Sequence, residues 1–209
     1  MNEITLYIDG REVKAKEGMT VLETARSAGI EIPTLCYHEA LSPYGACLLC
    51  IVEVANTITG GRSMLVTSCT HPVEEGLIVN TGSPRVIKAR KVIVELLLAR
   101  CPYVKVLQDL AQQMGIEEAR FRSEDKGELC VLCGLCVRYC KEVIGAGAID
   151  FINKGDRRGV TIAPQIFSEA CIGCGACASI CPTGAIRVED IPPHRILVLP
   201  LLSTLLPSG

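Results

Sequence analysis

CVLCGLCVRYC, residues 130–140, and CIGCGACASIC, residues 171–181, dictate the organisation of the second half of this chain. Both stretches have the spacing C-x2-C-x2-C-x3-C, by which cysteine thiolates hold 4Fe-4S clusters. In a paired run of this kind, three cysteines bind one cluster and the fourth binds the cluster of the other run. We therefore expect one 4Fe-4S cluster on Cys130, Cys133, Cys136 and Cys181, and a second on Cys171, Cys174, Cys177 and Cys140.

One feature of the runs departs from the bacterial pattern. Pro182 follows Cys181 as that pattern requires, but Lys141 follows Cys140. The change removes no ligand. Zinc is a poor alternative, because zinc motifs use separate C-x2-C pairs rather than quartets. Small residues beside the cysteines let backbone N–H groups approach the sulfurs: Gly134, Gly173, Gly175 and Ala176.

The two cysteine runs belong to an internal duplication. In each half, the first three cysteines are followed by a predicted short helix and then by a strand-like stretch, AIDFIN at 148–153 and AIRVED at 185–190. Such a repeat is typical of a two-cluster ferredoxin module with pseudo-two-fold symmetry, which we place at residues 123–190. Residues 191–209 form an apolar, proline-punctuated tail. We expect it either to dock on a partner or to be a disordered or covered terminus.

A separate set of four cysteines lies near the N-terminus, with the spacing C-x10-C-x2-C-x18-C. Four thiolates satisfy the two tetrahedral irons of a 2Fe-2S cluster, although the first loop is longer than in the plant-type run. A four-cysteine zinc ribbon is the competing interpretation. The residues of the predicted 2Fe-2S site are Cys36, Cys47, Cys50 and Cys69.

The residues around this first set predict a β-grasp domain at residues 1–80. A β-hairpin is predicted at the start of the chain, with strands EITLYI (3–8) and REVKAK (11–16) joined by the turn Asp9-Gly10. Thr20 and Glu23 form a capping box for the helix that follows. Further strands are expected after Leu48, at 64–68 and at 77–80. These cues favour 2Fe-2S over zinc, and the predicted fold class is α+β.

A helical connector is predicted at residues 81–122. Ser83 and Pro84 begin a helix that runs to about Arg100, and a second helix runs from about Val104 to Gly115. The thirteenth cysteine, Cys101, lies between the two helices, and we expect it to be a buried small hydrophobe rather than a ligand. His38, two residues after Cys36, is expected to pack the loop or to tune a sulfur.

Composition excludes several classes of function. The scattered basic residues, the net charge of −2 and the absence of tryptophan give no nucleic-acid surface. No apolar run reaches the roughly 20 residues of a membrane helix. The N-terminus lacks a signal-peptide core, so we expect a reducing cytoplasm rather than a disulfide scaffold. Neither a nucleotide-binding loop nor a catalytic constellation is visible, so no catalytic residues are predicted.

Several motifs together resemble a known family: IPTLCYH (32–38) with GACLLC (45–50) and Cys69, VIVELLLARCP (92–102), and the two duplicated runs, the second continuing to Pro182. They are similar to the gamma-type diaphorase subunit of NAD-linked hydrogenases and formate dehydrogenases. They are also similar to the N-terminal part of the large iron-sulfur subunit of respiratory complex I.

The resemblance implies a subunit that relays electrons in a soluble complex. Its partners would be a flavin- and NAD(H)-binding subunit and a catalytic subunit of hydrogenase or formate dehydrogenase type, with ferredoxin as a further partner. Many relatives bind another 4Fe-4S cluster after the long helix through one histidine and three cysteines. Here ARCPYVKVLQDLAQQMG (99–115) holds only Cys101, so we expect that cluster to be absent.

Two other classes of function remain open from the sequence. A free ferredoxin-like carrier would shuttle between enzymes, but the connector helices and the apolar tail have little use in such a protein. A redox sensor would need an output domain, which the sequence does not show. A stable complex with flavin-containing and catalytic subunits favours the relay, whereas an isolated monomer favours the carrier.

Overall fold

A computed structural model describes residues 3–56, 58, 60–121, 127–162, 170–191 and 194–198. The chain divides into two compact units. The first comprises Met1–Tyr37 and Pro43–Val94, and the second comprises His38–Ser42 and Glu95–Gly209. Each unit is described by itself below. The division into segments 1–80, 81–122, 123–190 and 191–209 stays a prediction.

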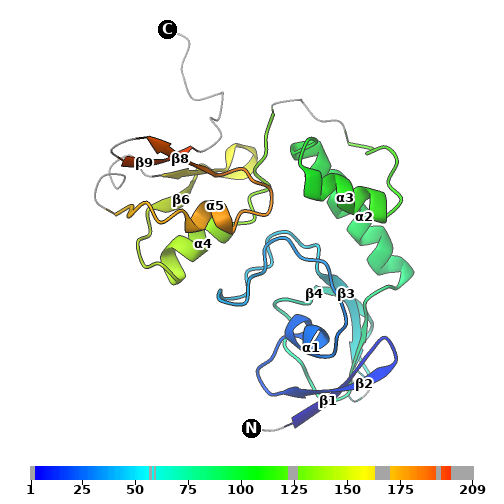
Figure 1. Cartoon of the computed structure of the whole chain (residues 1–209). Coiled ribbons are helices and arrows are strands. Elements are labelled where there is room, and N and C mark those ends of the chain that lie inside the picture. Colours follow the sequence, from blue (N-terminus) through cyan, green and yellow to red (C-terminus); the bar gives the residue numbers. More distant parts are fainter. Residues whose placement is uncertain are drawn as a thin grey trace. The chain divides into compact units, whose positions relative to one another are not determined.

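The first unit opens with the predicted hairpin. Strands β1 (Glu3–Ile8) and β2 (Arg11–Lys16) pair antiparallel, and Ile8 lies opposite Arg11. Asp9 and Gly10 both have left-handed backbones, with φ values of 50° and 77°, as a tight two-residue hairpin turn requires. The hairpin prediction is therefore confirmed (Figure 1).

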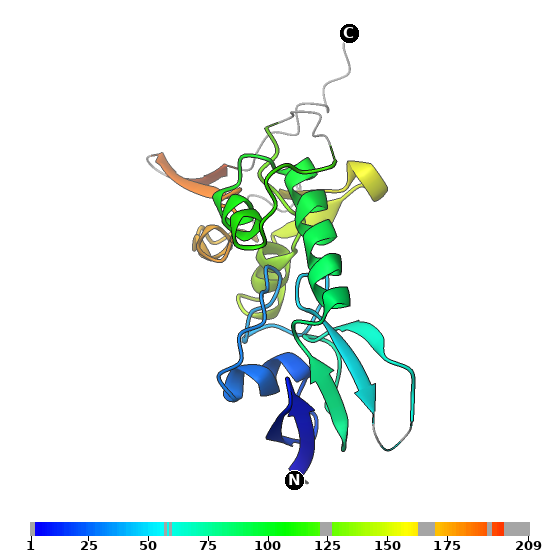
Figure 2. The same cartoon turned by 90° about the vertical axis from the view of Figure 1, so that its right-hand side faces the viewer.

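Three further strands complete a mixed five-stranded sheet in the order β2-β1-β5-β3-β4. β5 (Leu77–Asn80) pairs parallel to β1, and β3 (Ile51–Asn56) pairs antiparallel to both β5 and β4 (Met64–Thr67). In Figure 2, β3 and β5 lie next to each other, and α2 begins just beyond the end of β5. This arrangement confirms the strands predicted from the sequence.

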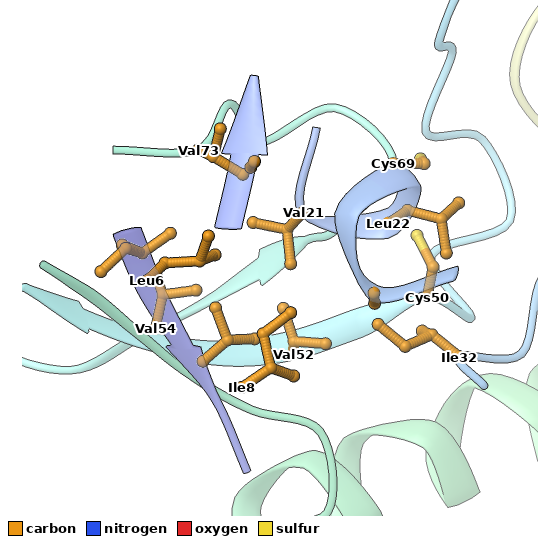
Figure 3. Packing of buried hydrophobic residues seen from close by; sticks show 14 residues of the cluster. Leu6, Ile8, Val21, Leu22, Ile32, Cys50, Val52, Val54, Cys69 and Val73 are labelled. Atoms are coloured by element: carbon orange, nitrogen blue, oxygen red, sulfur yellow. The ribbon is translucent and has the colours of Figure 1, made fainter. Parts of the chain in front are cut away.

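Helix α1 (Val21–Ser27) supplies the other side of the core. Its capping box is formed: the Glu23 N–H donates to Thr20 Oγ1 at 3.3 Å, and Glu23 Oε2 accepts from the Thr20 N–H at 2.8 Å. Figure 3 shows Val21 and Leu22 among strand residues such as Leu6 and Val52. Cys50 and Cys69 belong to the same buried cluster, so part of the first cysteine set is also part of the hydrophobic core.

Two helices follow the sheet, as predicted. α2 (Pro84–Arg100) is capped at its start, where Ser83 Oγ accepts from the Val86 N–H at 3.2 Å. α3 (Lys105–Gln113) begins after the break at Pro102. Cys101 is fully buried between them, as expected for a small hydrophobe, and burial raises the pKa of its thiol to about 12.

The duplicated half contains α4 (Leu135–Glu142) and α5 (Ala176–Ser179), each preceded by a glycine in the left-handed conformation. The matching positions before them, Leu132 and Gly173, are also left-handed, with φ values of 56° and 67°. The two halves thus share one backbone pattern, which supports the internal duplication. Both helices begin one residue before the third cysteine of their run, whereas the sequence predicted helices that begin after it.

Short antiparallel pairs complete the second unit. The predicted strands β6 (Ile149–Ile152) and β8 (Arg187–Ile191) are present, and they pair with β7 (Gly159–Ile162) and β9 (His194–Val198) respectively. A one-turn 3-10 helix, Gly155–Arg157, lies between β6 and β7. β9 falls within the predicted tail, whose residues 199–209 lie outside the described part of the chain.

Candidate iron-sulfur sites

The first cysteine set is brought together by loops at one end of the β-grasp core. Cys36, Cys47 and Cys50 lie on the long connection between α1 and β3, and Cys69 follows β4. All four are buried, and none is more than 7% exposed. Figure 3 shows Cys50 and Cys69 near Leu22 of α1, so the helix covers this side of the site.

The four thiols form two hydrogen-bonded pairs, Cys36 with Cys47 and Cys50 with Cys69. The hydrogen bond from Cys36 lowers the pKa of Cys47 to about 6, and the partner's pKa is raised by the same contact. Likewise, the bond from Cys69 lowers the pKa of Cys50 to about 6. Two adjacent thiol pairs match what a 2Fe-2S cluster needs, because each of its irons takes two thiolates.

Backbone contacts hold these thiols in place. The Cys47 N–H donates to Cys36 Sγ at 3.4 Å. The N–H and the hydroxyl of Ser68 both donate to the carbonyl of Cys50, at 3.1 and 2.8 Å, so the residue before Cys69 is tied directly to Cys50. Buried hydrogen bonds of this kind hold the predicted ligands in a fixed orientation.

The side chain of His38 packs within its own loop and against Tyr139. Its Nδ1 accepts from the Ala40 N–H at 3.1 Å, and its ring lies edge-on to Tyr139 with the centroids 5.6 Å apart. Both contacts lie within the second unit. They match the loop-packing role expected of this residue from the sequence.

The eight cysteines of the duplicated runs gather around two pockets in the second unit. One pocket is lined by Cys130, Cys133, Cys136 and Cys181, and the other by Cys140, Cys171, Cys174 and Cys177. Within the described residues, no three His, Cys, Asp or Glu side chains converge as they would around one metal ion. The thiols instead surround a wider space, which suits the corners of a cubane cluster, and the grouping is the crossed one expected from the sequence.

The two pockets differ in charge. Arg100 and Glu128 line the first, whereas the residues described around the second are all uncharged. Arg100 Nε donates to the carbonyl of Cys130 at 2.8 Å. Burial, the largest influence, raises the pKa of Cys130, and the Arg100 charge opposes that rise. Sequence reasoning did not identify Arg100, although its place beside Cys101 at the end of α2 was a usable signal.

A second group that the sequence did not reveal anchors α4. The Arg138 side chain is nearly buried and donates to the carbonyl of Ser42, and the Ser42 N–H donates to Glu142 Oε2 at 3.0 Å. Arg138 lies between Cys136 and Cys140 on the same helix. Residues His38–Ser42 therefore pack on the helix that carries cysteines of both pockets.

Comparison with known proteins agrees with these sites. Residues 1–84 match the family model of the 2Fe-2S iron-sulfur cluster binding domain, and residues 129–185 match that of the 4Fe-4S dicluster domain. The first match favours a 2Fe-2S cluster over the zinc alternative for the N-terminal set. The assignment of individual cysteines stays a prediction.

Full-length relatives share most of this chain. It is 34% identical to the NADP-reducing hydrogenase subunit HndD of Solidesulfovibrio fructosivorans over 89% of this chain and 36% of the relative. It is 33% identical to the NADH-ubiquinone oxidoreductase 75 kDa subunit of Reclinomonas americana over 88% of this chain and 29% of the relative. The chain thus spans about a third of these relatives or less.

A solved structure has the same fold. A chain of the NAD+-reducing [NiFe]-hydrogenase in the H2-reduced state matches with a TM-score of 0.74 and 28% identity, over 87% of this chain and 85% of that one. The fold and the three cysteine sets define an iron-sulfur protein that combines a 2Fe-2S domain with a 4Fe-4S dicluster domain. The chain is a homologue of subunits of NAD(P)-linked hydrogenases and of complex I. No helix in the described part of the chain has the length and apolar character needed to cross a membrane.

Proposed function

We propose that this chain relays single electrons between a flavin- and NAD(H)-binding subunit and a catalytic subunit of hydrogenase or formate dehydrogenase type, within a soluble complex of the cytoplasm. Its cofactors would be one 2Fe-2S cluster on the first cysteine set and two 4Fe-4S clusters on the crossed sets. When bound, such clusters accept and release one electron at a time. The names of two relatives, an NADP-reducing hydrogenase subunit and an NAD+-reducing hydrogenase, support a nicotinamide-linked complex of hydrogenase type.

One observation carries the proposal: in each half of the duplication, two cysteines within about one helical turn line different pockets. Cys136 and Cys140 lie on α4, and they line different pockets. Four helical residues rise only about 6 Å, so one turn of backbone separates the two sites. Cys177 on α5 and Cys181 just beyond it repeat this arrangement. The two predicted cluster sites thus lie close together, which suits a relay better than substrate chemistry.

Iron content tests the proposed cofactors. Anaerobically reconstituted protein should bind about ten irons per chain, two for the 2Fe-2S cluster and four for each 4Fe-4S cluster. EPR of the reduced protein should show both cluster types. A Cys101→Ala variant should bind the same amount of iron, because Cys101 is assigned to no cluster. About eight irons together with one zinc would reassign the first set to zinc, and about fourteen would mean a further cluster.

Electron delivery tests the proposed role. NADH should reduce the clusters of this chain only when the flavin-containing subunit is present, because no nucleotide-binding loop motif is visible in the sequence. The bleaching of visible cluster absorbance in stopped-flow measurements reports this reduction. A variant with Cys50→Ser should lose the 2Fe-2S signal and slow delivery to the catalytic subunit. Reduction at equal rates without the flavin subunit, or a chain that forms no complex with either partner, would contradict the relay.

A further inference from the structure

Arg90 reaches from α2 to the strand that follows a cluster ligand. Its Nη2 donates to the carbonyl of Ile51 at 2.7 Å, and Ile51 is the first residue of β3, directly after Cys50. All of these residues lie in the first unit. The guanidinium is thus held beside the backbone of a predicted 2Fe-2S ligand, about forty residues away from it in the sequence.

The position is an unusual one for a cation. The Nε of Arg90 is buried and has no hydrogen-bond partner, and the described residues place no carboxylate within ion-pair distance. Burial lowers the pKa of Arg90, and the negative charges of Cys50 and Asp9 oppose that effect. Arg90 is partly buried. A cation withdrawn from water without a paired charge is costly, so a compensating negative charge is expected nearby.

The two anionic groups near Arg90 are not equivalent. Both carboxylate oxygens of Asp9 accept hydrogen bonds from Thr81, at 2.7 Å from its N–H and 2.6 Å from its hydroxyl. The nearest acidic residue on β3, Glu53, is paired with Arg85 and accepts from Ser83. Cys50 remains, and its thiol is hydrogen-bonded to Cys69, another predicted ligand of the cluster.

We propose that Arg90 is a positioning residue whose fixed positive charge raises the reduction potential of the 2Fe-2S cluster held by the first cysteine set. The proposal rests on the cofactor assigned under the proposed function. Reduction adds one electron to the cluster and no proton to Arg90, so the cluster site becomes more negative by one charge. A nearby cation that water screens poorly stabilises that added charge, and charge near the sulfurs is an established influence on cluster potentials.

The experiment is a redox titration of the full-length holoprotein with chemical mediators, followed by the EPR signal of the 2Fe-2S cluster. Arg90→Gln removes the charge but keeps an amide donor for the Ile51 carbonyl. We expect this variant to lower the reduction potential. At a fixed potential, the ratio of oxidised to reduced cluster should rise by about tenfold or more, which equals about 59 mV for a one-electron couple. Arg90→Lys keeps the charge and should stay within about threefold of the wild type.

Lys88→Gln is the matched control, because it removes one exposed positive charge from the same helix. Solvent and salt screen that charge, so the ratio should change by less than about twofold. If Arg90→Gln does not retain iron, Arg90→Met replaces the partly buried cation with an apolar chain and should show the same downward shift in potential. The shift at Arg90 should also persist in high salt.

Three results would overturn the proposal. One is an Arg90→Gln or Arg90→Met variant with full iron content and an unchanged potential. Another is an Arg90→Lys variant that shifts as far as the glutamine variant, since hydrogen bonding rather than charge would then be responsible. The third is the absence of a 2Fe-2S signal in the wild type, which would also overturn the cofactor assignment. Failure to bind partner subunits would contradict the proposed relay but would not affect this shift in reduction potential.

Discussion

Combining Cys140→Ser with Cys171→Ser should cost no more iron than either change alone, at about six irons per chain instead of about ten. Both cysteines line the same pocket, although they lie in different runs. Combining Cys140→Ser with Cys133→Ser should instead leave about two irons, because those residues line different pockets and each change destroys a separate cluster.

The predicted assignment of Cys181 to the cluster of the first run provides the reciprocal test. Cys181→Ser with Cys133→Ser should leave about six irons, and Cys181→Ser with Cys171→Ser about two. Iron and sulfide analysis with EPR of each double variant distinguishes the two outcomes, and Cys101→Ala serves as the control that removes a thiol without removing a ligand. If each run instead bound its own cluster, the results for the two kinds of double variant would be exchanged. That exchange would refute the crossed assignment.

Iron removal should unfold the duplicated half of the chain and leave the β-grasp sheet largely folded. The reason is the size of the two cores. The sheet and α1 enclose fourteen buried residues, of which only Cys50 and Cys69 are cysteines. In the duplicated half, the described core cluster has five buried residues, and two of them, Cys136 and Cys177, are predicted ligands. The bound metal therefore supplies a much larger share of the folding free energy there.

Hydrogen exchange before and after anaerobic chelation measures this difference. Amides of α4, β6 and β8 should lose nearly all protection, whereas those of β1, β3 and β5 should keep most of theirs. Amide hydrogens in the loops that carry the first cysteine set should exchange faster, because the thiols of these loops lose the metal. Equal loss of protection in both halves would contradict the prediction, and so would a duplicated half that stays protected without iron.

Local sequence signals predicted most of the secondary structure. The Asp9-Gly10 turn, the capping box of Thr20 and the Ser83-Pro84 helix start each depend on residues within a few positions of one another. The structure confirms all three features. Their hydrogen bonds are local, so they form regardless of the surrounding tertiary structure. Strands β7 and β9 were not predicted. Each is short, and each is stabilised by pairing with another strand rather than by a pattern of its own.

The cysteine spacing specified which residues are candidate ligands, because the loop lengths of a cluster motif are written directly in the chain. Tertiary packing was needed to show which charges lie beside them. Arg100 lines the pocket of Cys130, and Arg90 reaches the strand after Cys50, each from a helix that is distant in sequence. A spacing pattern contains no information about such neighbours, since they depend on how α2 lies within each unit. The candidate ligand sets are thus read from the sequence, whereas the charges around each set are a property of the folded chain.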